Sequence, residues 1–339
     1  MTWNWTETTL NNLRQFLEKL SLTEGELAAT PIGDGHSNLT YLVSDGRRNL
    51  VVRRPPPPPL PPGGHDVLRE ARILMALENT PVPTAKVLAT CEASSVLDVP
   101  FYVMEFIDGI VITDKVSPSL ASPQSRKALG EAMVDHLAAL HGLDWKKLGL
   151  ENIGKPIGFN ARHLHRIKSL ICDEQGVPAE FSDIYNWLYQ NIPTDSGCCL
   201  IHNDYRIGNL MWDNKTPVQL RAILDWELAT LGDPLFDLAY VLCSFPPVTG
   251  ARTATQELSL AMLEEGFPSR DELVERYAGL TGANLSQLLW YEVMVDWKLA
   301  ALYEYSRRRG EDAYYRKDGL VAGFLQASRK KLDSADAWI

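Results

Sequence analysis

The chain has 339 residues, of which 45% are hydrophobic and 22% charged, as in an ordinary globular protein with room for two domains. Its formal net charge of −10 argues against nucleic acid or an anionic membrane as the main partner, but not against a local basic site for a phosphate-bearing ligand. No signal peptide, no bilayer-length apolar stretch and no C-x-x-C spacing is visible, so we expect a cytoplasmic protein without a zinc site or a disulfide framework.

The first segment predicts a helix and then a β-hairpin. Residues 9–20 carry apolar side chains at helical spacing, and alternating strands at 39–43 and 49–53 flank a turn at 44–47. The turn before the hairpin contains Gly35, Ser37 and Asn38, and a glycine-bearing turn lets backbone N–H groups approach phosphates closely. A plain hairpin with glycines for its turn geometry is the alternative interpretation.

A proline-rich run at 55–62 reads as a stiff spacer, and residues 67–77 then predict an amphipathic helix. Arg53 at the end of the second strand and Glu70 on this helix are placed to form an ion pair, although Glu70 could also be a solvated surface charge. Strands follow at 85–91 and 100–107. The second ends at Glu105 and Ile107, where a hinge could grip adenine through backbone groups.

Most of the remaining sequence predicts helices. Ser122 and Pro123 open a helix that ends near His141, and helical patterns cover residues 158–191, 255–265, 271–280 and 285–309. We expect His141 to be a core or capping histidine. The last of these helices carries an apolar and aromatic stripe, which is usually core but could line an acceptor pocket, and it ends in three arginines.

Two short apolar strands in this helical part deliver polar side chains at their ends. The first, at 199–201, precedes His202, Asp204 and Asn209, and the second, at 222–224, precedes Asp225. The pattern H-x-D-x-x-x-x-N followed by an aspartate after a strand is typical of kinase-like phosphotransferases. Such enzymes need a carboxylate to orient a hydroxyl group, and oxygen ligands that hold Mg²⁺ on phosphates. Ordinary turn chemistry is the alternative for each residue alone.

Asp233 and Asp237 follow at a turn that opens a buried helix. Both could bind Mg²⁺, but their position at a helix start favours capping and hydrogen bonding to the backbone of the catalytic loop.

The chain resembles the aminoglycoside phosphotransferase-like, or choline kinase-like, superfamily. It is most similar to the branch that includes the kinase-like domains of acyl-CoA dehydrogenase family members ten and eleven. The matching motifs run from the glycine-bearing turn at 35–41 through 52–56, 69–70, 100–106 and 202–210 to 224–234. The resemblance implies an α+β, bilobal protein-kinase-like fold. Residues 1–107 would form a nucleotide-binding lobe with an antiparallel sheet, and residues 108–339 a mainly helical catalytic and acceptor-binding lobe.

The resemblance also implies a role for each site residue. Asp204 would be the catalytic base, and Asn209 and Asp225 would hold Mg²⁺. Gly35, Ser37, Asn38 and Arg53 would contact the nucleotide, Glu70 would orient Arg53, and Glu105 and Ile107 would offer backbone groups to adenine. Arg53 stands where protein kinases use lysine, and Trp226-Glu227 replaces the Phe-Gly that follows the second aspartate in those enzymes.

We therefore expect an enzyme that moves the γ-phosphoryl group of ATP, or of another nucleoside triphosphate, to a small-molecule hydroxyl group with Mg²⁺. The sequence does not identify the acceptor or the oligomeric state. A hydroxyacyl-type metabolite is one candidate, and an aminoglycoside, amino alcohol or sugar is the alternative. A catalytically silent nucleotide-binding module and a metal-dependent phosphohydrolase built on His202 and Asp204 are the rival functions.

Overall fold

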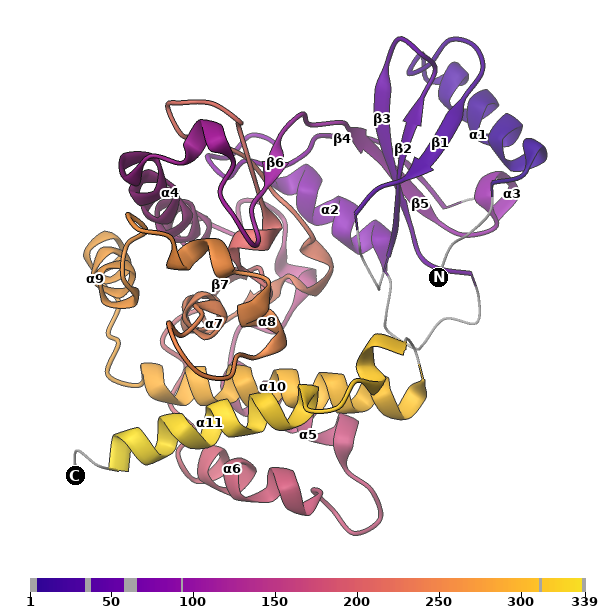
Figure 1. Cartoon of the computed structure of the whole chain (residues 1–339). Coiled ribbons are helices and arrows are strands. Elements are labelled where there is room, and N and C mark those ends of the chain that lie inside the picture. Colours follow the sequence, from indigo (N-terminus) through magenta and orange to yellow (C-terminus); the bar gives the residue numbers. More distant parts are fainter. Residues whose placement is uncertain (1–4, 34–37, 58–65, 93, 311–312, 337–339) are drawn as a thin grey trace. The chain divides into compact units, whose positions relative to one another are not determined.

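A computed structural model describes residues 5–33, 38–57, 66–92, 94–310 and 313–336, and the chain divides into two compact units (Figure 1). The first unit comprises Met1–Asp108 together with Ala222–Glu227, and the second comprises Gly109–Arg221 together with Leu228–Ile339. The structure has the predicted α+β class, with an antiparallel sheet and many helices. The segment 222–227, which carries Asp225, belongs to the first unit although the sequence division assigned it to the second lobe.

The first unit is built on a five-stranded antiparallel sheet in the order β1-β2-β3-β5-β4. Its strands are β1 (Ala28–Pro31), β2 (Leu39–Ser44), β3 (Asn49–Arg54), β4 (Val87–Cys91) and β5 (Phe101–Glu105). Its helices are α1 (Glu7–Lys19), α2 (Val67–Leu77) and the short α3 (Ser94–Leu97). The predicted hairpin is confirmed, because β2 and β3 pair antiparallel with Thr40 opposite Arg53.

Local chemistry explains where these elements start and which side they bury. Thr6 and Thr9 form a capping box at the start of α1, and Asp66 accepts a hydrogen bond from the Arg69 N–H at the start of α2. Alternation along β2 points Tyr41 and Val43 to one face of the sheet, where the core lies. This core consists of Leu13, Leu17, Tyr41, Val43, Leu50, Val52, Cys91, Leu97, Phe101 and Val103.

The second unit is mainly helical. Its α-helices are α4 (Pro123–His141), α5 (Phe159–Ile171), α6 (Ala179–Gln190), α7 (Leu235–Ser244), α8 (Ala254–Glu257), α9 (Arg270–Thr281), α10 (Leu288–Arg309) and α11 (Leu320–Asp336). Its strands are β6 (Ile110–Val111), β7 (Cys199–Ile201), β8 (Leu210–Trp212) and β10 (Thr230–Gly232), and β9 (Leu220–Ile223) leads from it into the first unit.

Helix α10 is the central element of the second unit. It packs against α5, α6, α7 and α11, and α11 runs alongside it in Figure 1. Trp290, Met294 and Trp297 are almost completely buried, and Gly310 ends the helix in a left-handed conformation that suits glycine. Beside this bundle, β7 pairs antiparallel with β10, and β6 pairs with β8.

The structure differs from the sequence prediction at several elements, among them β10 (Thr230–Gly232), a strand where a turn was expected. The predicted continuous helix at 158–191 is two helices, because the chain turns at Asp173 and Gly176 (φ 103°) and Pro178 then precedes α6. The predicted helix at 255–265 is α8 followed by a short 3-10 helix at Leu260–Leu263. The sequence prediction missed β1 and α11, although Phe324, Leu325 and Ser328 show helical spacing on the buried side of α11.

No helix in the described residues combines the length and the apolar character that a membrane crossing requires.

Candidate active site

Arg53 on β3 connects three segments of the first unit. Its Nε donates to Glu70 Oε2 on α2 at 2.9 Å, and its Nη1 donates to Thr40 Oγ1 on β2 at 3.1 Å. Its Nη2 donates to Asp225 Oδ1 at 2.5 Å. The predicted Arg53–Glu70 pair is therefore present. The guanidinium group is held more firmly than the sequence suggests, because Asp225 is a second carboxylate partner.

Burial and ion pairing act in opposite directions on this group. The Arg53 side chain is 12% exposed and that of Glu70 only 2%. Burial disfavours the charge on Arg53, but Glu70 and Asp225 outweigh it and hold the pKa of Arg53 well above its usual value. Burial raises the pKa of Glu70, and the ion pair with Arg53 limits this rise.

Asp225 lies just beyond β9 in a backbone conformation that is uncommon for aspartate, with a φ of 65°. Its side chain is 37% exposed, which leaves it accessible to solvent or a ligand. Nearby, Glu227 Oε2 accepts a hydrogen bond from Asn38 Nδ2 at 3.0 Å and lies 3.7 Å from Arg53 Nη2. The first unit thus brings together Asn38, Arg53, Glu70 and Asp225, four of the residues predicted from the sequence.

The other residues predicted to contact the nucleotide are less informative. Gly35 and Ser37 lie outside the described residues. Glu105 is the last residue of β5, and its backbone N–H donates to the Lys86 carbonyl at 2.9 Å. Ile107 is half-buried two residues further along the chain. The interaction of Glu105 and Ile107 with adenine stays a prediction.

Asp204 and Asn209 lie together in the second unit, in the loop that follows β7. The Asn209 side-chain Nδ2 donates to the Asp204 backbone oxygen at 2.9 Å and to its carboxylate Oδ2 at 2.8 Å. Arg206 Nε is 3.6 Å from the other carboxylate oxygen of Asp204. The carboxylate is therefore held between an amide and a guanidinium group, and it is 18% exposed.

The backbone of this loop is fixed by Asp237 on α7. Its carboxylate accepts hydrogen bonds from the His202 N–H and the Asn203 N–H, each at 2.6 Å, and lies 3.2 Å from His141 Nε2. Burial alone would raise the pKa of Asp237, but His141 and the His202 N–H outweigh it and hold the pKa below its usual value. The predicted hydrogen bonding of Asp237 to the catalytic-loop backbone is confirmed, as is a core position for His141.

Asp233 also has a structural position. Its carboxylate accepts from the Ser196 N–H and hydroxyl group, each at 2.6 Å, from the Leu235 N–H at 3.0 Å and from the Tyr291 hydroxyl at 2.8 Å. These donors occupy both oxygens, so the capping interpretation is confirmed for Asp233.

Sequence analysis missed Lys298 on α10, whose side chain is buried beside the loop. Its Nζ donates to the Asn203 carbonyl at 3.0 Å and to the Asn203 side-chain Oδ1 at 2.6 Å. Asn203 has a φ of 68°, and a residue held in this conformation needs support from its surroundings. A lysine within an otherwise apolar and aromatic helical stripe was the signal that could have identified it.

Tyr240 on α7 was missed as well. Lys298 Nζ lies 5.3 Å from the centre of its ring, and its hydroxyl group is hydrogen-bonded to Asp204. Burial, and then Asp204, raise the pKa of Tyr240 well above its usual value, so the hydroxyl stays protonated and donates to the carboxylate.

Most of the apolar stripe of α10 belongs to the core. Trp290, Met294 and Trp297 are at most 1% exposed. Leu289, at the start of the same stripe, lines the larger cavity described next. Of the arginines that end the helix, Arg307 and Arg308 are paired with Glu304. A role of this helix in acceptor binding stays a prediction.

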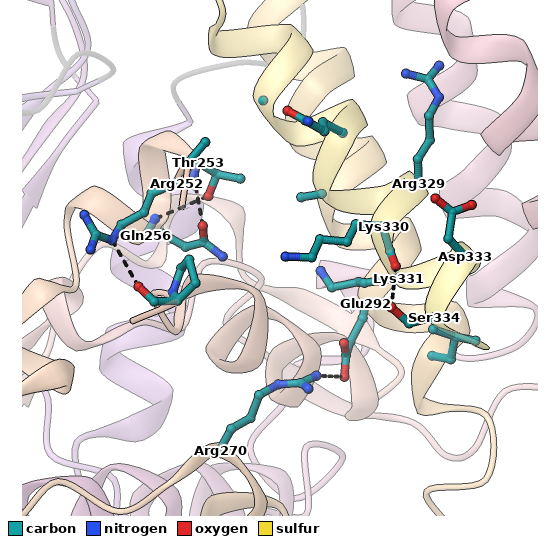
Figure 2. A pocket seen from close by; sticks show the side chains of 16 residues that line it. Arg252, Thr253, Gln256, Arg270, Glu292, Arg329, Lys330, Lys331, Asp333 and Ser334 are labelled. Atoms are coloured by element: carbon teal, nitrogen blue, oxygen red, sulfur yellow. Dashed lines mark hydrogen bonds and ion pairs between the residues drawn. The ribbon is translucent and has the colours of Figure 1, made fainter. Parts of the chain in front are cut away.

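A cavity of about 910 Å³ lies elsewhere in the second unit (Figure 2), lined by residues from 247–256, from the start of α10 and from α11. Figure 2 shows Arg270 paired with Glu292 and Lys330 extending toward Gln256, whereas Arg329 points away. None of the predicted site residues lines this cavity. It is therefore separate from the groups described above.

The predicted Mg²⁺ ligands, Asn209 and Asp225, belong to different units. The Asn209 amide nitrogen is committed to Asp204, so its carbonyl oxygen is the atom that can bind a cation. This oxygen and the Asp225 carboxylate are hard ligands of the type that Mg²⁺ prefers. The described residues contain no cluster of three or more His, Cys, Asp or Glu side chains suited to a metal.

Comparison with known proteins shows the family of the chain. Residues 28–273 match the model of the phosphotransferase enzyme family. The chain is 34% identical to acyl-CoA dehydrogenase family member 10 of Mus musculus over 75% of its length, and 32% identical to acyl-CoA dehydrogenase family member 11 of Rattus norvegicus over 91%. It spans only 25% and 41% of the lengths of those two proteins.

Among solved structures, a protein of Ralstonia eutropha that is provisionally named an aminoglycoside phosphotransferase has a TM-score of 0.76 and 28% sequence identity, with 95% of each chain covered. An ADP-bound aminoglycoside phosphotransferase has a TM-score of 0.53 at 18% identity, with 93% of this chain and 96% of that chain covered, and shows likeness of fold alone.

Proposed function

Because the chain belongs to the phosphotransferase enzyme family, we propose that it transfers the γ-phosphoryl group of ATP, or of another nucleoside triphosphate, to a hydroxyl group of a small molecule. The second unit supplies the catalytic carboxylate, and the first unit supplies the residues that bind the nucleotide. We keep the cytoplasm as the predicted compartment, since all five cysteines are free thiols.

Asp204 is the base in this proposal. A carboxylate within hydrogen-bond reach of the acceptor hydroxyl orients that hydroxyl and takes its proton as the oxygen attacks phosphorus. Asn209 and Tyr240 hold the Asp204 carboxylate in one orientation. Lys298 and Asp237 fix the backbone that carries it. Such positioning is the main contribution that a protein makes to phosphoryl transfer.

Arg53, Glu70 and Asp225 bind the nucleotide phosphates in the proposal, with Glu70 orienting Arg53. Mg²⁺ held by Asp225 and Asn209 would neutralise charge on the phosphates. Arg53 Nη2 donates to Asp225, so a cation that takes over the Asp225 carboxylate frees this donor for a phosphate oxygen. Glu227 connects Asn38 to this group, because its carboxylate accepts a hydrogen bond from Asn38 and lies 3.7 Å from Arg53 Nη2.

The observation that carries the proposal is the pair of hydrogen bonds from Asn209 to Asp204 within the H-x-D-x-x-x-x-N loop. A turn that served only the fold would not need a partly exposed carboxylate held by an amide, a guanidinium group and a phenol. We disfavour a catalytically silent module for the same reason, because a module without activity would not need this arrangement of Asp204 and Asn209.

The acceptor class is the open part of the proposal. A hydroxyacyl-type metabolite fits the similarity to parts of proteins named as acyl-CoA dehydrogenase family members. An aminoglycoside, amino alcohol or sugar is the alternative, and the name of the Ralstonia eutropha protein favours it.

The proposal is tested by coupled detection of ADP release with Mg²⁺, ATP and a panel of hydroxy acids, hydroxyacyl thioesters, amino alcohols and aminoglycosides. We expect acceptor-stimulated ADP release for at least one class and no release without Mg²⁺. Mg²⁺–ATP binding without release for any class would instead favour the silent module.

A further inference from the structure

A second, smaller cavity of the second unit has an unusual charge distribution. Its volume is about 160 Å³, and four of its lining side chains are basic in type, namely Lys155, Arg162, His163 and Arg166. No carboxylate lines it. Since the chain has 43 acidic and 33 basic residues, a cavity whose ionisable lining residues are all basic departs from the charge balance of the whole molecule.

The cations of this cavity also lack acidic partners. Arg162 Nη2 donates to the Lys155 carbonyl at 2.6 Å, and Arg166 Nη2 lies 3.4 Å from His163 Nδ1. Across the part of the chain that the structure describes, no ion pair joins Lys155, Arg162 or Arg166 to a carboxylate. Burial lowers the pKa of Arg166, and no carboxylate offsets this effect. Lys155 and Arg166 are exposed and Arg162 is half-buried, so the cluster presents positive charge without a carboxylate partner to an anion that approaches from solvent.

The larger cavity shows the contrast. There Arg270 is paired with Glu292, Lys331 with Asp296 and Arg329 with Asp183. Cations that line a cavity of this protein can thus have a carboxylate partner within the chain. The smaller cavity is different because its cations have none.

His163 contributes a neutral side chain to the lining of the cavity. It is 4% exposed, and burial, followed by the charges of Lys298 and Arg166, lowers its pKa well below its usual value. Arg166 Nη2 lies close to its Nδ1, while its Nε2 is buried without a partner among the described residues. The positive charge of the cavity therefore comes from Lys155, Arg162 and Arg166.

The cavity lies close to the catalytic loop. Thr230 and Leu231 line it and belong to β10, where Thr230 is paired with Ile201 of β7. Asp204 follows Ile201 by three residues. Paired Cα atoms are ~5 Å apart and extended chain advances ~3.5 Å per residue, so Thr230 lies within roughly 16 Å of Asp204.

The size of the cavity indicates what it can hold. Sites for whole small molecules usually have volumes of about 300–1,000 Å³. A volume of about 160 Å³ is too small for a complete cofactor but accommodates one carboxylate or phosphate group. The remainder of such a molecule would extend out of the cavity.

We propose that this cavity is a subsite for an anionic group, a carboxylate or a phosphate, on the acceptor whose hydroxyl group Asp204 receives. The inference rests on the proposed function and narrows its acceptor class. Arg162, Arg166 and Lys155 supply the charge. A polycationic aminoglycoside is repelled by the same groups, so this subsite selects against that class.

The first experiment measures anion binding and needs no catalysis. Inorganic phosphate and acetate are titrated by calorimetry into the full chain with Mg²⁺–ADP present, so that the nucleotide site is filled. We expect millimolar binding of one or both, and the two probes distinguish a phosphate subsite from a carboxylate subsite. Arg166→Gln and the double variant Arg162→Gln/Arg166→Gln should lose this binding at least ten-fold. Lys168→Gln, on the same helix but outside the cavity lining, is the matched control and should keep it.

The second experiment compares acceptors that carry an anionic group with neutral alcohols of the same carbon skeleton. In Arg166→Gln the KM of the anionic compounds should rise about ten-fold relative to that of the neutral ones, and Lys168→Gln should leave this ratio unchanged. The inference is overturned if neither probe binds or if the Arg166→Gln and double variants bind like wild type. It is also overturned if the probes bind while the KM ratio stays constant, which indicates an adventitious ion only. Absence of acceptor turnover in the wild type would refute the proposed function instead, because the calorimetric result does not depend on turnover.

Discussion

The ammonium group of Lys298 lies 2.6 Å from the side-chain oxygen of Asn203, the residue that immediately precedes Asp204. Lys298 also donates to the Asn203 carbonyl, so one buried cation holds both parts of a residue with a left-handed backbone. The carboxylate that we propose as the base is thus positioned by a residue of α10 that lies 94 residues further along the sequence than Asp204.

Replacing Lys298 should therefore impair catalysis without removing a group that touches the substrate. In Lys298→Met we expect kcat to fall between ~10-fold and ~100-fold while the KM for ATP changes little, because a small displacement of Asp204 weakens alignment. Steady-state kinetics with the best acceptor measure this. Lys147→Met, an exposed loop lysine, is the control. An unchanged kcat in Lys298→Met would show that the loop keeps its geometry without this cation.

The same lysine predicts a pH effect. Burial lowers the pKa of Lys298 to about 8, an effect that Asp204 and Asp237 oppose and Arg166 increases. The pKa of a lysine in the unfolded state is ~10.4. Between about pH 8 and ~10.4 the unfolded state therefore binds more protons at this residue than the folded state does. The free energy of unfolding that is linked to Lys298 rises with pH over this range. The free energy of unfolding of wild type should thus increase relative to Lys298→Met from about pH 8 to about pH 10. Denaturant titrations at several pH values test this, and a constant difference would contradict it.

Asp237→Asn should destabilise the second unit. An amide offers one acceptor oxygen where the carboxylate accepts from both the His202 and the Asn203 N–H, and a buried donor left unsatisfied costs about 1–3 kcal/mol. Because the pKa of Asp237 is lowered in the folded state, its contribution is complete above ~4 and is lost as the pH falls further. Urea denaturation should show that the free energy of unfolding of Asp237→Asn is lower than that of wild type at neutral pH, and that this difference becomes smaller in acid. The control variant Asp271→Asn, at an exposed position, should unfold like wild type at both pH values.

Glu70→Ala leaves Arg53 with Asp225 and, at 3.7 Å, Glu227 as its carboxylate partners. Removing one member of a buried ion pair costs about 3–5 kcal/mol, so we expect a marked loss of thermal stability together with weaker ATP binding. Arg47→Met, in the same hairpin but 80% exposed, should change neither property. Wild-type stability and ATP affinity in Glu70→Ala would refute the assigned role of this pair.

Asp225→Ala should act on the metal. Ligand binding raises the melting temperature by mass action, so the extra stabilisation that Mg²⁺ adds to ATP should shrink or vanish in this variant. Differential scanning fluorimetry with ATP alone and with Mg²⁺–ATP provides the comparison. If the Mg²⁺-dependent increment in the variant equals that of wild type, Asp225 is not a metal ligand.

Much of the fold and of the candidate site could be predicted because the signals are local. The spacing from His202 to Asn209 fits one loop, and the hairpin pattern placed Arg53 opposite Thr40. The pairing of Arg53 with Glu70 required only a strand and the next helix. The first of the two compact units ends its main segment at Asp108, near the expected boundary at residue 107. That the first unit binds the nucleotide and the second binds the acceptor stays a prediction.

The parts that could not be predicted depend on contacts between distant segments. Lys298 reaches Asn203 across 95 residues, and nothing in either segment alone indicates the other. The basic cavity combines α5 with β10, which are brought together by strand pairing rather than by sequence proximity. The aromatic stripe of α10 was compatible with both core and pocket, since burial on all sides depends on which helices surround it.

The central claim is that Asp204 directs transfer of the γ-phosphoryl group to a hydroxyl group. Its most direct test is to incubate wild type and Asp204→Asn with Mg²⁺, ATP labelled at the γ-phosphate and the best acceptor, and to measure label on the acceptor. We predict transfer by wild type and a loss of roughly 10²–10⁴ in kcat for Asp204→Asn, with the thermal shift by Mg²⁺–ATP retained. Transfer by Asp204→Asn at the wild-type rate would contradict the account.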